Sequence, residues 1–282
     1  MCDECGCAAG NGHVHVSCAQ GLIAHSQPGP ESVEVLTAIL RQNDHDAAHN
    51  RAHFDEHRVL AVNLMSSPGS GKTSLLEATI EALGDRYRIA VIEGDLETEN
   101  DAQRIRAKGV PAIQITTGST CHLDARMVHD ALHGLTLADL DILFIENVGN
   151  LVCPAGFDLG QHANVALLSV TEGDDKPAKY PVLFRGSDLV LLTKADLLEV
   201  LDDFDPAKAE KAVRGLANPA QVVTLSTRRP DSLAPWLAWL DAQVAERRAQ
   251  PAAPEAHHHH HHHHHHHDHD HHPHDHDQTP AE

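Results

Sequence analysis

Seven short apolar runs recur along the middle of the chain, and polar or amphipathic stretches separate them. The runs are VLAVNLM, RIAVIEGD, AIQITTG, DILFIEN, VALLSV, LVLLTKAD and VVTLST. Continuous runs of this kind are typical of strands that are buried on both faces. The stretches between them favour helices, and strands that alternate with helices build βαβ units. We therefore predict an α/β fold with a mainly parallel sheet flanked by helices.

Other segments flank this predicted sheet. Residues 31–57 favour a leading helix, and the stretch PDSLAPWLAWLDAQVAERRA favours an amphipathic closing helix. Residues 1–30 are small, polar and rich in Gly, Cys and His, which is typical of a flexible arm. Residues 249–282 form a Pro/Ala linker and a histidine-rich tail that cannot bury an apolar core, so we expect disorder without metal. The predicted organisation is an arm (1–30), one α/β domain (31–248) and a tail (249–282).

Composition narrows the classes of function. Aromatic residues make up only 3% of the 282 residues, so the core must consist mainly of Ala, Val, Leu and Ile. The formal net charge of −20 argues against a nucleic-acid groove, which needs a basic face. The sequence contains no apolar stretch of membrane-spanning length, and MCDECGCAAG lacks a signal core, so we expect a cytoplasmic protein. In that reducing compartment the six cysteines indicate metal ligands or structural thiols.

The stretch SSPGSGKTSLL follows the first apolar run and opens a predicted helix, which is the context of a P-loop. Backbone N–H groups of such a loop surround a phosphate at the helix N-terminus. Lys72 would reach the β- and γ-phosphate oxygens and Thr73 would coordinate Mg²⁺. The usual motif has Gly at its first position, where this chain has Ser66. The predicted phosphate-binding residues are Gly69, Ser70, Gly71, Lys72, Thr73 and Ser74.

Two further runs end in acids that could complete a Mg²⁺ shell. Glu146 ends the apolar run DILFIEN, and Gly149 three residues later would let the backbone approach the γ-phosphate. Asp95 follows another predicted strand in GDLETEND. We therefore assign catalytic roles to Lys72, Thr73, Asp95 and Glu146.

The stretch LVLLTKAD predicts recognition of the base. The Asp196 carboxylate can accept hydrogen bonds from guanine N1–H and the 2-amino group, whereas adenine lacks both donors. Lys194 can lie along the base, and Thr193 stands where the usual N-K-x-D motif has Asn. This pattern favours GTP over ATP.

Cysteine and histidine residues form two candidate metal sites. The thiols of Cys2, Cys5 and Cys7 with the terminal amine could form a planar site that suits Ni²⁺, and a mobile thiol-rich end is the alternative. Cys121, His122 and Cys153 follow predicted strands whose carboxyl ends converge, so they could meet near the nucleotide and share a metal across a symmetric dimer. The alternative for these three is two buried thiols and an ordinary polar histidine.

The remaining histidines fall into a column and a tail. His45, His49, His53 and His57 recur every four residues, and we favour the polar face of a helix over a metal site for them. Sixteen of the 27 histidines lie in the tail between His257 and His276, where interleaved Asp residues argue against a purification tag. Three or four imidazoles per ion would let this tail store roughly 4–5 nickel ions. Cys18 has no assigned role.

Together these motifs resemble the hydrogenase nickel incorporation GTPases, the HypB family of SIMIBI-class P-loop GTPases. The resemblance covers roughly residues 1–245 and rests on MCDECGC, NLMSSPGSGKTSLLE, GDLETENDAQRI, TGSTCHLDARMV, IENVGNLVCPA, TEGDDKPAKYP and TKADLL. Ser at the first P-loop position is common in this family. Histidine-rich nickel stores occur in some members, usually near the N-terminus, whereas this chain carries its histidines at the C-terminal end.

The resemblance implies a tight nickel site at Cys2, Cys5 and Cys7 and a second Ni²⁺ or Zn²⁺ site at Cys121, His122 and Cys153. It also implies three partners: a second copy of the chain, a small zinc-containing nickel chaperone of the HypA type, and the large-subunit precursor of [NiFe] hydrogenase. The predicted function is that of a metal-regulated GTPase that delivers nickel during hydrogenase maturation. Hydrolysis is expected to be slow, because no arginine finger or catalytic glutamine is visible.

Two alternatives remain open. A urease nickel GTPase has the same fold, but its Cys-Pro-His motif is absent here and CHLDA stands instead. A non-enzymatic nickel storage protein with a vestigial P-loop is the alternative from another class.

Overall fold

The computed structural model describes residues 30–95, 100–118 and 120–250 of the chain. The predicted N-terminal arm with Cys2, Cys5, Cys7 and Cys18 lies outside the described residues, and so does the histidine-rich tail.

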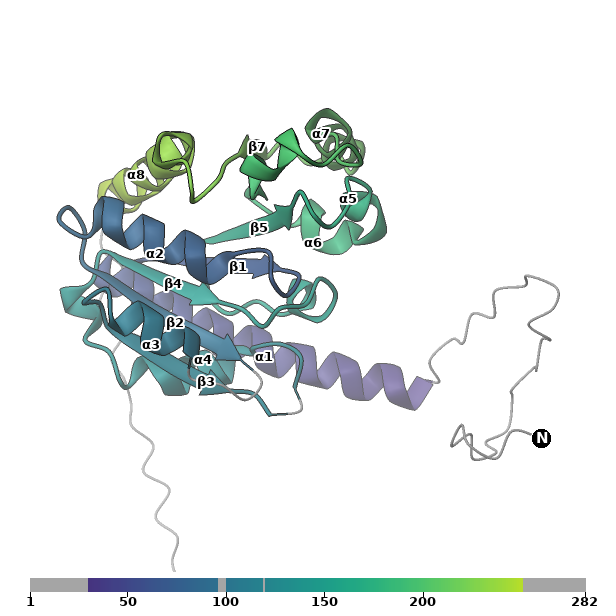
Figure 1. The fold of residues 1–282 in the computed structure, drawn as a ribbon. Helices are drawn as coiled ribbons and strands as arrows, with labels where there is room; N and C mark the ends of the chain where they lie inside the picture. Colours follow the sequence, from purple (N-terminus) through teal and green to yellow (C-terminus); the bar gives the residue numbers. More distant parts are fainter. Residues whose placement is uncertain (1–29, 96–99, 119, 251–282) are drawn as a thin grey trace, which may run out of the picture.

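Seven strands form one parallel sheet in the order β3-β2-β4-β1-β5-β6-β7 (Figure 1). Their bounds are β1 Leu60–Ser66, β2 Ile89–Asp95, β3 Ala112–Thr116, β4 Ile142–Glu146, β5 Ala163–Ser169, β6 Leu189–Thr193 and β7 Gln221–Thr224. All seven apolar runs are strands, so the predicted parallel α/β sheet is confirmed. The last run forms the shortest strand, β7, which lies at an edge of the sheet and pairs with β6.

Helices connect the strands and cover both faces of the sheet. Their bounds are α1 Pro30–His57, α2 Lys72–Leu83, α3 Asn100–Arg106, α4 Ala125–Leu132, α5 Lys176–Lys179, α6 Pro181–Arg185, α7 Pro206–Gly215 and α8 Ala234–Ala249. The predicted closing helix begins later than expected, since Pro230–Leu233 forms a 3-10 turn before α8. Pro235 explains this boundary, because a residue without an N–H suits the first helical turn.

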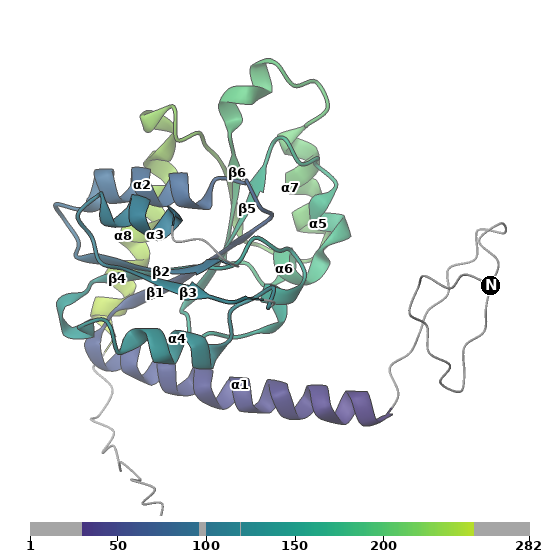
Figure 2. The same cartoon turned by 60° about the horizontal axis from the view of Figure 1, so that its bottom comes forward.

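The strands have two buried faces, as their composition predicts. In β1, Leu60, Val62 and Leu64 point into one apolar cluster with α2 and α8, where Trp236 is fully buried. Ala61 points the opposite way, into a cluster with α1 and α4. A third cluster fills the space between β5, β6 and the helices α6 and α7. Figure 2 shows α2 and α3 on one side of the sheet and α4 and α1 on the other.

The C-terminal half of α1 is fixed to the body by buried polar contacts. Asn43 Nδ2 donates to the Asp158 carbonyl at 2.8 Å, and Asn50 Nδ2 donates to the carbonyls of Ala125 and Leu159. Gly160 has φ +88°, and a Cβ there would meet the Ala47 carbonyl at 2.6 Å. The close approach of α1 thus requires glycine at this position. The N-terminal part of α1 extends beyond the sheet (Figures 1 and 2).

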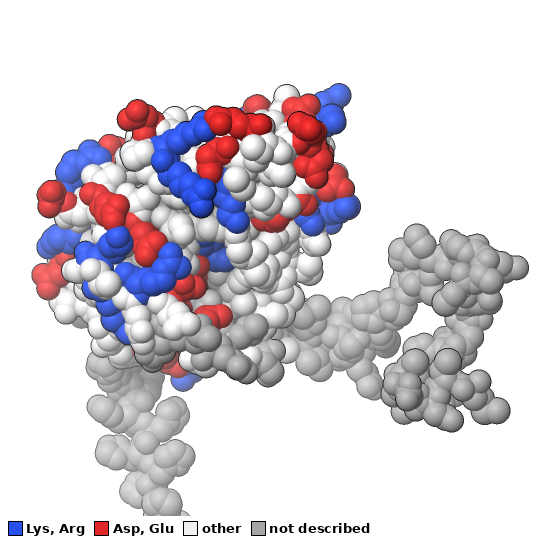
Figure 3. Space-filling model, in the orientation of Figure 1, with Lys and Arg blue, Asp and Glu red and all other residues white. Residues whose placement is uncertain are grey.

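Acidic and basic side chains are interspersed on the described face that Figure 3 shows, rather than gathered into areas of one sign. Several are paired between elements, for example Arg104 with Glu77 at 2.7 Å and Arg86 with Asp241 at 3.1 Å. None of the helices in residues 30–95, 100–118 and 120–250 has the length and apolar character that a membrane span requires.

Candidate nucleotide and metal-binding sites

The P-loop motif connects β1 to α2 at the centre of the sheet. β1 lies between β4 and β5, where the direction of the chain across the sheet reverses, and ligands of α/β sheets bind at such a point. Gly69 and Gly71 have φ of +75° and +94°, a region in which residues with a Cβ are strained. Gly71 is the N-cap of α2, so the backbone N–H groups of the first helical turn face the loop. This geometry is that of a phosphate-binding loop.

Ser66, which departs from the usual motif, contacts the P-loop lysine. Lys72 is buried, and its Nζ donates to Ser66 Oγ at 3.1 Å and lies 4.0 Å from Glu146 Oε1. The Ser66 hydroxyl in turn donates to the Ser67 carbonyl at 2.7 Å. A glycine would offer no such acceptor, so Ser66 orients the ammonium group toward the site.

Buried carboxyls gather beside the start of α2. Thr73 Oγ1 donates to Glu146 Oε1 at 3.0 Å, and Glu93 of β2 is paired in register with Glu146 of β4. Burial, and next the neighbouring Glu146, raise the pKa of Glu93 to about 10, while burial also raises the pKa of Glu146. Glu93 Oε1 and Glu146 Oε2 have no hydrogen-bond partner among the described residues. A hydroxyl beside unpaired carboxyl oxygens is a donor set that fits Mg²⁺.

Glu93 is a candidate that our sequence reasoning missed. We expected Asp95 as the second acid, and both residues line one cavity of about 470 Å³ with Lys72 and Thr73. The signal for Glu93 was an acid that directly follows the apolar residues IAVI, two positions before Asp95. A buried acid in a central strand needs a partner, which the sequence does not show.

Gly149 links this cavity to the loop that follows β4. A Cβ at Gly149 would lie 2.9 Å from Pro68 Cα, so the loop packs directly on the P-loop backbone. We expected this glycine to let the backbone approach the γ-phosphate, and the described contact is with the P-loop itself. The loop after Glu146 and the P-loop are therefore in direct contact.

The expected base-recognition residues line a second cavity of about 280 Å³ next to the P-loop. Thr193 Oγ1 donates to the Ser70 carbonyl at 2.7 Å, and Lys194 Nζ donates to the Gly69 carbonyl at 2.6 Å. Asp196 Oδ1 accepts a hydrogen bond from Ser226 Oγ at 2.5 Å, and this bond holds the pKa of Asp196 below its usual value. Asp196 is therefore an ionised acceptor in a fixed orientation.

Two supporting residues were missing from our expectations. Ser226 lies near the end of the last apolar run, VVTLST, just after β7, and only the fold brings it to Asp196. Glu172 lies in the motif TEGDDKP, and its Oε1 accepts from Ser70 Oγ at 2.6 Å. Both therefore stabilise residues of the predicted nucleotide site.

The structure also brings Cys121, His122 and Cys153 together, with donor atoms within 4.8 Å of one another. The Sγ atoms of Cys121 and Cys153 are 2.9 Å apart, both thiols are free, and Cys121 Sγ lies 3.9 Å from His122 Nδ1. The contact with Cys121 raises the pKa of the Cys153 thiol, and burial lowers the pKa of His122. Two sulfurs and an imidazole nitrogen suit Zn²⁺ or Ni²⁺.

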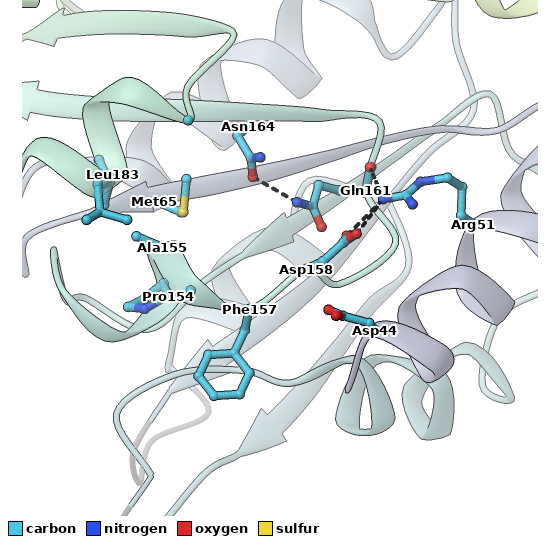
Figure 4. Close-up of a pocket in the computed structure, with 13 residues that line it drawn as sticks. Asp44, Arg51, Met65, Pro154, Ala155, Phe157, Asp158, Gln161, Asn164 and Leu183 are labelled. Carbon is cyan, nitrogen blue, oxygen red and sulfur yellow. Dashed lines mark hydrogen bonds and ion pairs between the residues drawn. The ribbon is translucent and has the colours of Figure 1, made fainter. Parts of the chain in front are cut away.

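The loop after Cys153 borders a cavity of about 380 Å³ (Figure 4). Its lining includes Pro154, Ala155 and Phe157. The Phe157 ring lies 4.0 Å from the His122 ring, centroid to centroid, so this loop positions the imidazole of the candidate site. Asp158 accepts from Arg51 at 2.8 Å on the opposite side of the cavity.

Two other groups of residues that we considered as metal ligands belong to the N-terminal arm and to α1. Cys2, Cys5 and Cys7 lie outside the described residues, so their ligand role stays a prediction. From the histidine column of α1, His49 and His53 meet His129 of α4, while His45 and His57 are not part of this group within the described residues.

Comparisons with known proteins agree with this geometry. The profile described as "CobW/HypB/UreG, nucleotide-binding domain" matches residues 60–224. Hydrogenase maturation factor HypB of Azotobacter vinelandii is 51% identical over 243 residues, which are 85% of this chain and 79% of that protein. The same factor of Escherichia coli K12 is 51% identical over 211 residues, 75% of this chain and 72% of that protein.

Solved structures give the same result. The crystal structure of HypB from Helicobacter pylori in complex with nickel has a TM-score of 0.70 and 41% identity, and it covers 76% of this chain and 100% of that chain. HypB from Archaeoglobus fulgidus has a TM-score of 0.68 and 38% identity over 73% of this chain and 100% of that chain. The match of the nucleotide-binding domain and the identity to these relatives show that the chain belongs to the HypB family of hydrogenase maturation factors.

Proposed function

We propose that the protein is a metal-regulated GTPase that binds nickel and delivers it to the large-subunit precursor of [NiFe] hydrogenase. One observation carries the proposal. Only six residues separate Glu146, beside the P-loop threonine, from Cys153 of the metal-ligand group, and Gly149 among them packs on Pro68. A change at the phosphates therefore moves a metal ligand.

In this proposal the P-loop from Gly69 to Ser74 binds the phosphates and Asp196 binds guanine. Thr73 and Glu146 would hold Mg²⁺, with Asp95 and Glu93 beside them in the cavity. When bound, Mg²⁺ would neutralise charge on the phosphate oxygens. Arg104 lines the same cavity, but its guanidinium is paired with Glu77 and Asp101, so it does not act as an arginine finger and hydrolysis is slow.

Cys121, His122 and Cys153 would supply three ligands to Ni²⁺ or Zn²⁺, and a second copy of the chain would complete the site. Two apolar side chains support such a homodimer. Val152, next to Cys153, is 63% exposed, and Val182 of α6 is 65% exposed. Since α6 packs against the segment Cys153–Gly156, both valines lie near the candidate metal ligands.

The terminal segments would supply the metal. Cys2, Cys5 and Cys7 form the tight nickel site, and the tail stores further nickel. A HypA-type chaperone and the hydrogenase precursor are the proposed partners, since the family acts in hydrogenase maturation.

The first experiment measures GTP hydrolysis and dimer mass of the full chain, each with and without Ni²⁺. We expect slow GTP turnover that requires Mg²⁺, and a dimer fraction that changes with nickel. Lys72→Ala should abolish turnover while Lys211→Ala, an exposed lysine of α7, should not. Equal turnover in Lys72→Ala would refute the P-loop assignment, and no turnover in wild type would favour the nickel storage protein.

The second experiment tests the coupling between the two sites. Cys121→Ala and Cys153→Ala should retain GTP binding and lose the effect of nickel on turnover or dimerisation. By linkage, nickel must change nucleotide affinity by the same factor by which nucleotide changes nickel affinity. An unchanged nickel response in both variants would contradict the proposed metal site.

A further inference from the structure

Three imidazoles from two helices converge on the sheet face that α1 and α4 cover. His49 and His53 lie on successive turns of α1, and His129 lies in the last turn of α4. Ring centroids are 4.5 Å apart for His49 and His53, 5.0 Å for His49 and His129, and 6.0 Å for His53 and His129. One ring nitrogen from each lies within 4.8 Å of the others. The four-residue spacing on α1 could by itself place His49 and His53 together, whereas only the fold brings His129 to them.

A buried amide sets the tautomer of the α4 histidine. Both hydrogen bonds from Asn50 Nδ2 go to backbone carbonyls, those of Ala125 and Leu159, and this leaves Asn50 Oδ1 as an acceptor. Oδ1 lies 3.2 Å from His129 Nδ1, so Nδ1 carries the proton and donates. Nε2 of His129 then holds a lone pair, which is the arrangement that metal-ligating histidines show in proteins.

We propose that His49, His53 and His129 form an additional metal site that binds one borderline divalent ion, Ni²⁺ or Zn²⁺. Nitrogens on one tetrahedral ion with bonds of about 2.05 Å lie about 3.3 Å apart, so the observed group closes by small side-chain rotations. His53 and His129 also line a cavity of about 200 Å³ together with His57 and His133. Neutral imidazoles bind such ions and bind Mg²⁺ poorly.

The last described turn of α8 contacts α1, the helix that carries His49 and His53. Asp55, two residues after His53, accepts a hydrogen bond from Arg247 of α8. Arg247 also donates to Gln250, the last described residue before the tail, at 2.7 Å. The end of α8 is thus bonded to the helix that carries His49 and His53, and the histidine group is separate from the group of Cys121, His122 and Cys153.

Histidine footprinting on the full chain tests this site, because it resolves individual histidines in the presence of the tail. Diethylpyrocarbonate modification rates are measured by mass spectrometry with Ni²⁺, Zn²⁺ or Mg²⁺ in excess over the tail's capacity. We expect Ni²⁺ and Zn²⁺ to slow modification of His49, His53 and His129 together, and Mg²⁺ to have no effect. Equal rates with and without Ni²⁺ and Zn²⁺ would overturn the proposal.

Matched variants separate this site from the others. In His129→Gln, protection of His49 and His53 should need at least about 10–100-fold more metal, which is the loss that removing even a supporting contact produces. His45→Gln, an exposed histidine of the same helix, and Cys121→Ala should keep the protection. Should His129→Gln unfold, His49→Ala at an exposed position replaces it. Protection that survives in the folded ligand variants, or that disappears in Cys121→Ala, contradicts a separate site.

Discussion

At the scale of single residues, we propose that the choice of nucleotide depends on Asp196. Asp196→Asn should weaken GTP binding about 10–100-fold, because hydrogen bonds to a charged acceptor contribute about 1.5–3 kcal/mol. The same change should improve binding of xanthosine triphosphate, since the new amide can donate to the 2-oxo group. Competition binding with both nucleotides measures the switch. Ser226→Ala, which removes the 2.5 Å bond to Asp196, should weaken GTP binding without changing the preference for GTP over xanthosine triphosphate. Unchanged selectivity in Asp196→Asn would mean that another residue reads the base.

His162 is a second residue whose protonation state depends on the residues around it. Its Nδ1 accepts from the Ala61 N–H at 3.0 Å and its Nε2 donates to Asp55, so the ring is neutral. Burial, and next Arg247, lower its pKa to about 4, against about 6.5 in an unfolded chain.

The neutral ring therefore adds stability that is complete above pH 6.5 and is lost as the pH falls from 6.5 toward 4. The pKa difference corresponds to about 3 kcal/mol. Urea unfolding between pH 7 and 4.5 should show a flatter decline for His162→Gln than for wild type, with His45→Gln as the exposed control. Parallel curves for His162→Gln and wild type would show that this histidine titrates normally.

At the scale of elements, the loop after β4 connects the nucleotide cavity to the metal-ligand group, and we propose that it couples the two. Gly149→Ala places a methyl group 2.9 Å from Pro68 Cα, so the P-loop or the loop must shift. Such overpacking costs about 1–3 kcal/mol, and GTP affinity should fall by about 10-fold or more. Gly156→Ala is the matched control, because a Cβ there meets nothing within 4 Å. Calorimetric titration with GTP compares the two, and equal affinities would exclude the proposed contact as a coupling element.

At the scale of the whole molecule, the terminal segments should act independently of the GTPase body. Changing Cys2, Cys5 and Cys7 together to Ala should remove the tightest nickel binding, because thiolates are the strongest ligands of the arm. GTP turnover should stay at the wild-type level, since the arm is separate in sequence from the P-loop and from Asp196. Nickel competition with a chromophoric chelator measures the loss, and a triple variant that binds nickel as tightly as wild type would refute the assignment.

Truncation of the tail is the second prediction at this scale. Removing all residues after Glu255 should lower nickel stoichiometry by roughly 4–5 ions, at three or four imidazoles per ion. GTP turnover and thermal stability should persist. Equilibrium dialysis with metal analysis gives the stoichiometry, and a chain of equal length with the tail histidines changed to Gln controls for the tail itself. Equal stoichiometry in truncated and full chains would end the reservoir hypothesis.

The sequence by itself determined the seven parallel strands and the P-loop, and it indicated that Cys121, His122 and Cys153 could meet, with two buried thiols and a polar histidine as the alternative. These features follow from local rules, because burial on both faces requires continuous apolar runs and parallel strands bring their carboxyl ends to one edge. The helix bounds were predicted less well, as the late start of α8 shows.

Only the tertiary structure decided which distant side chains meet. Glu93 faces Glu146 through strand register, and Ser226 reaches Asp196 from another strand end. His129 joins His49 and His53 because α4 packs against α1, and Asn50 then sets its tautomer. None of these pairs has a characteristic spacing in the sequence. Contacts between elements depend on the packing of whole helices and strands, which a local pattern of apolar and polar residues does not specify.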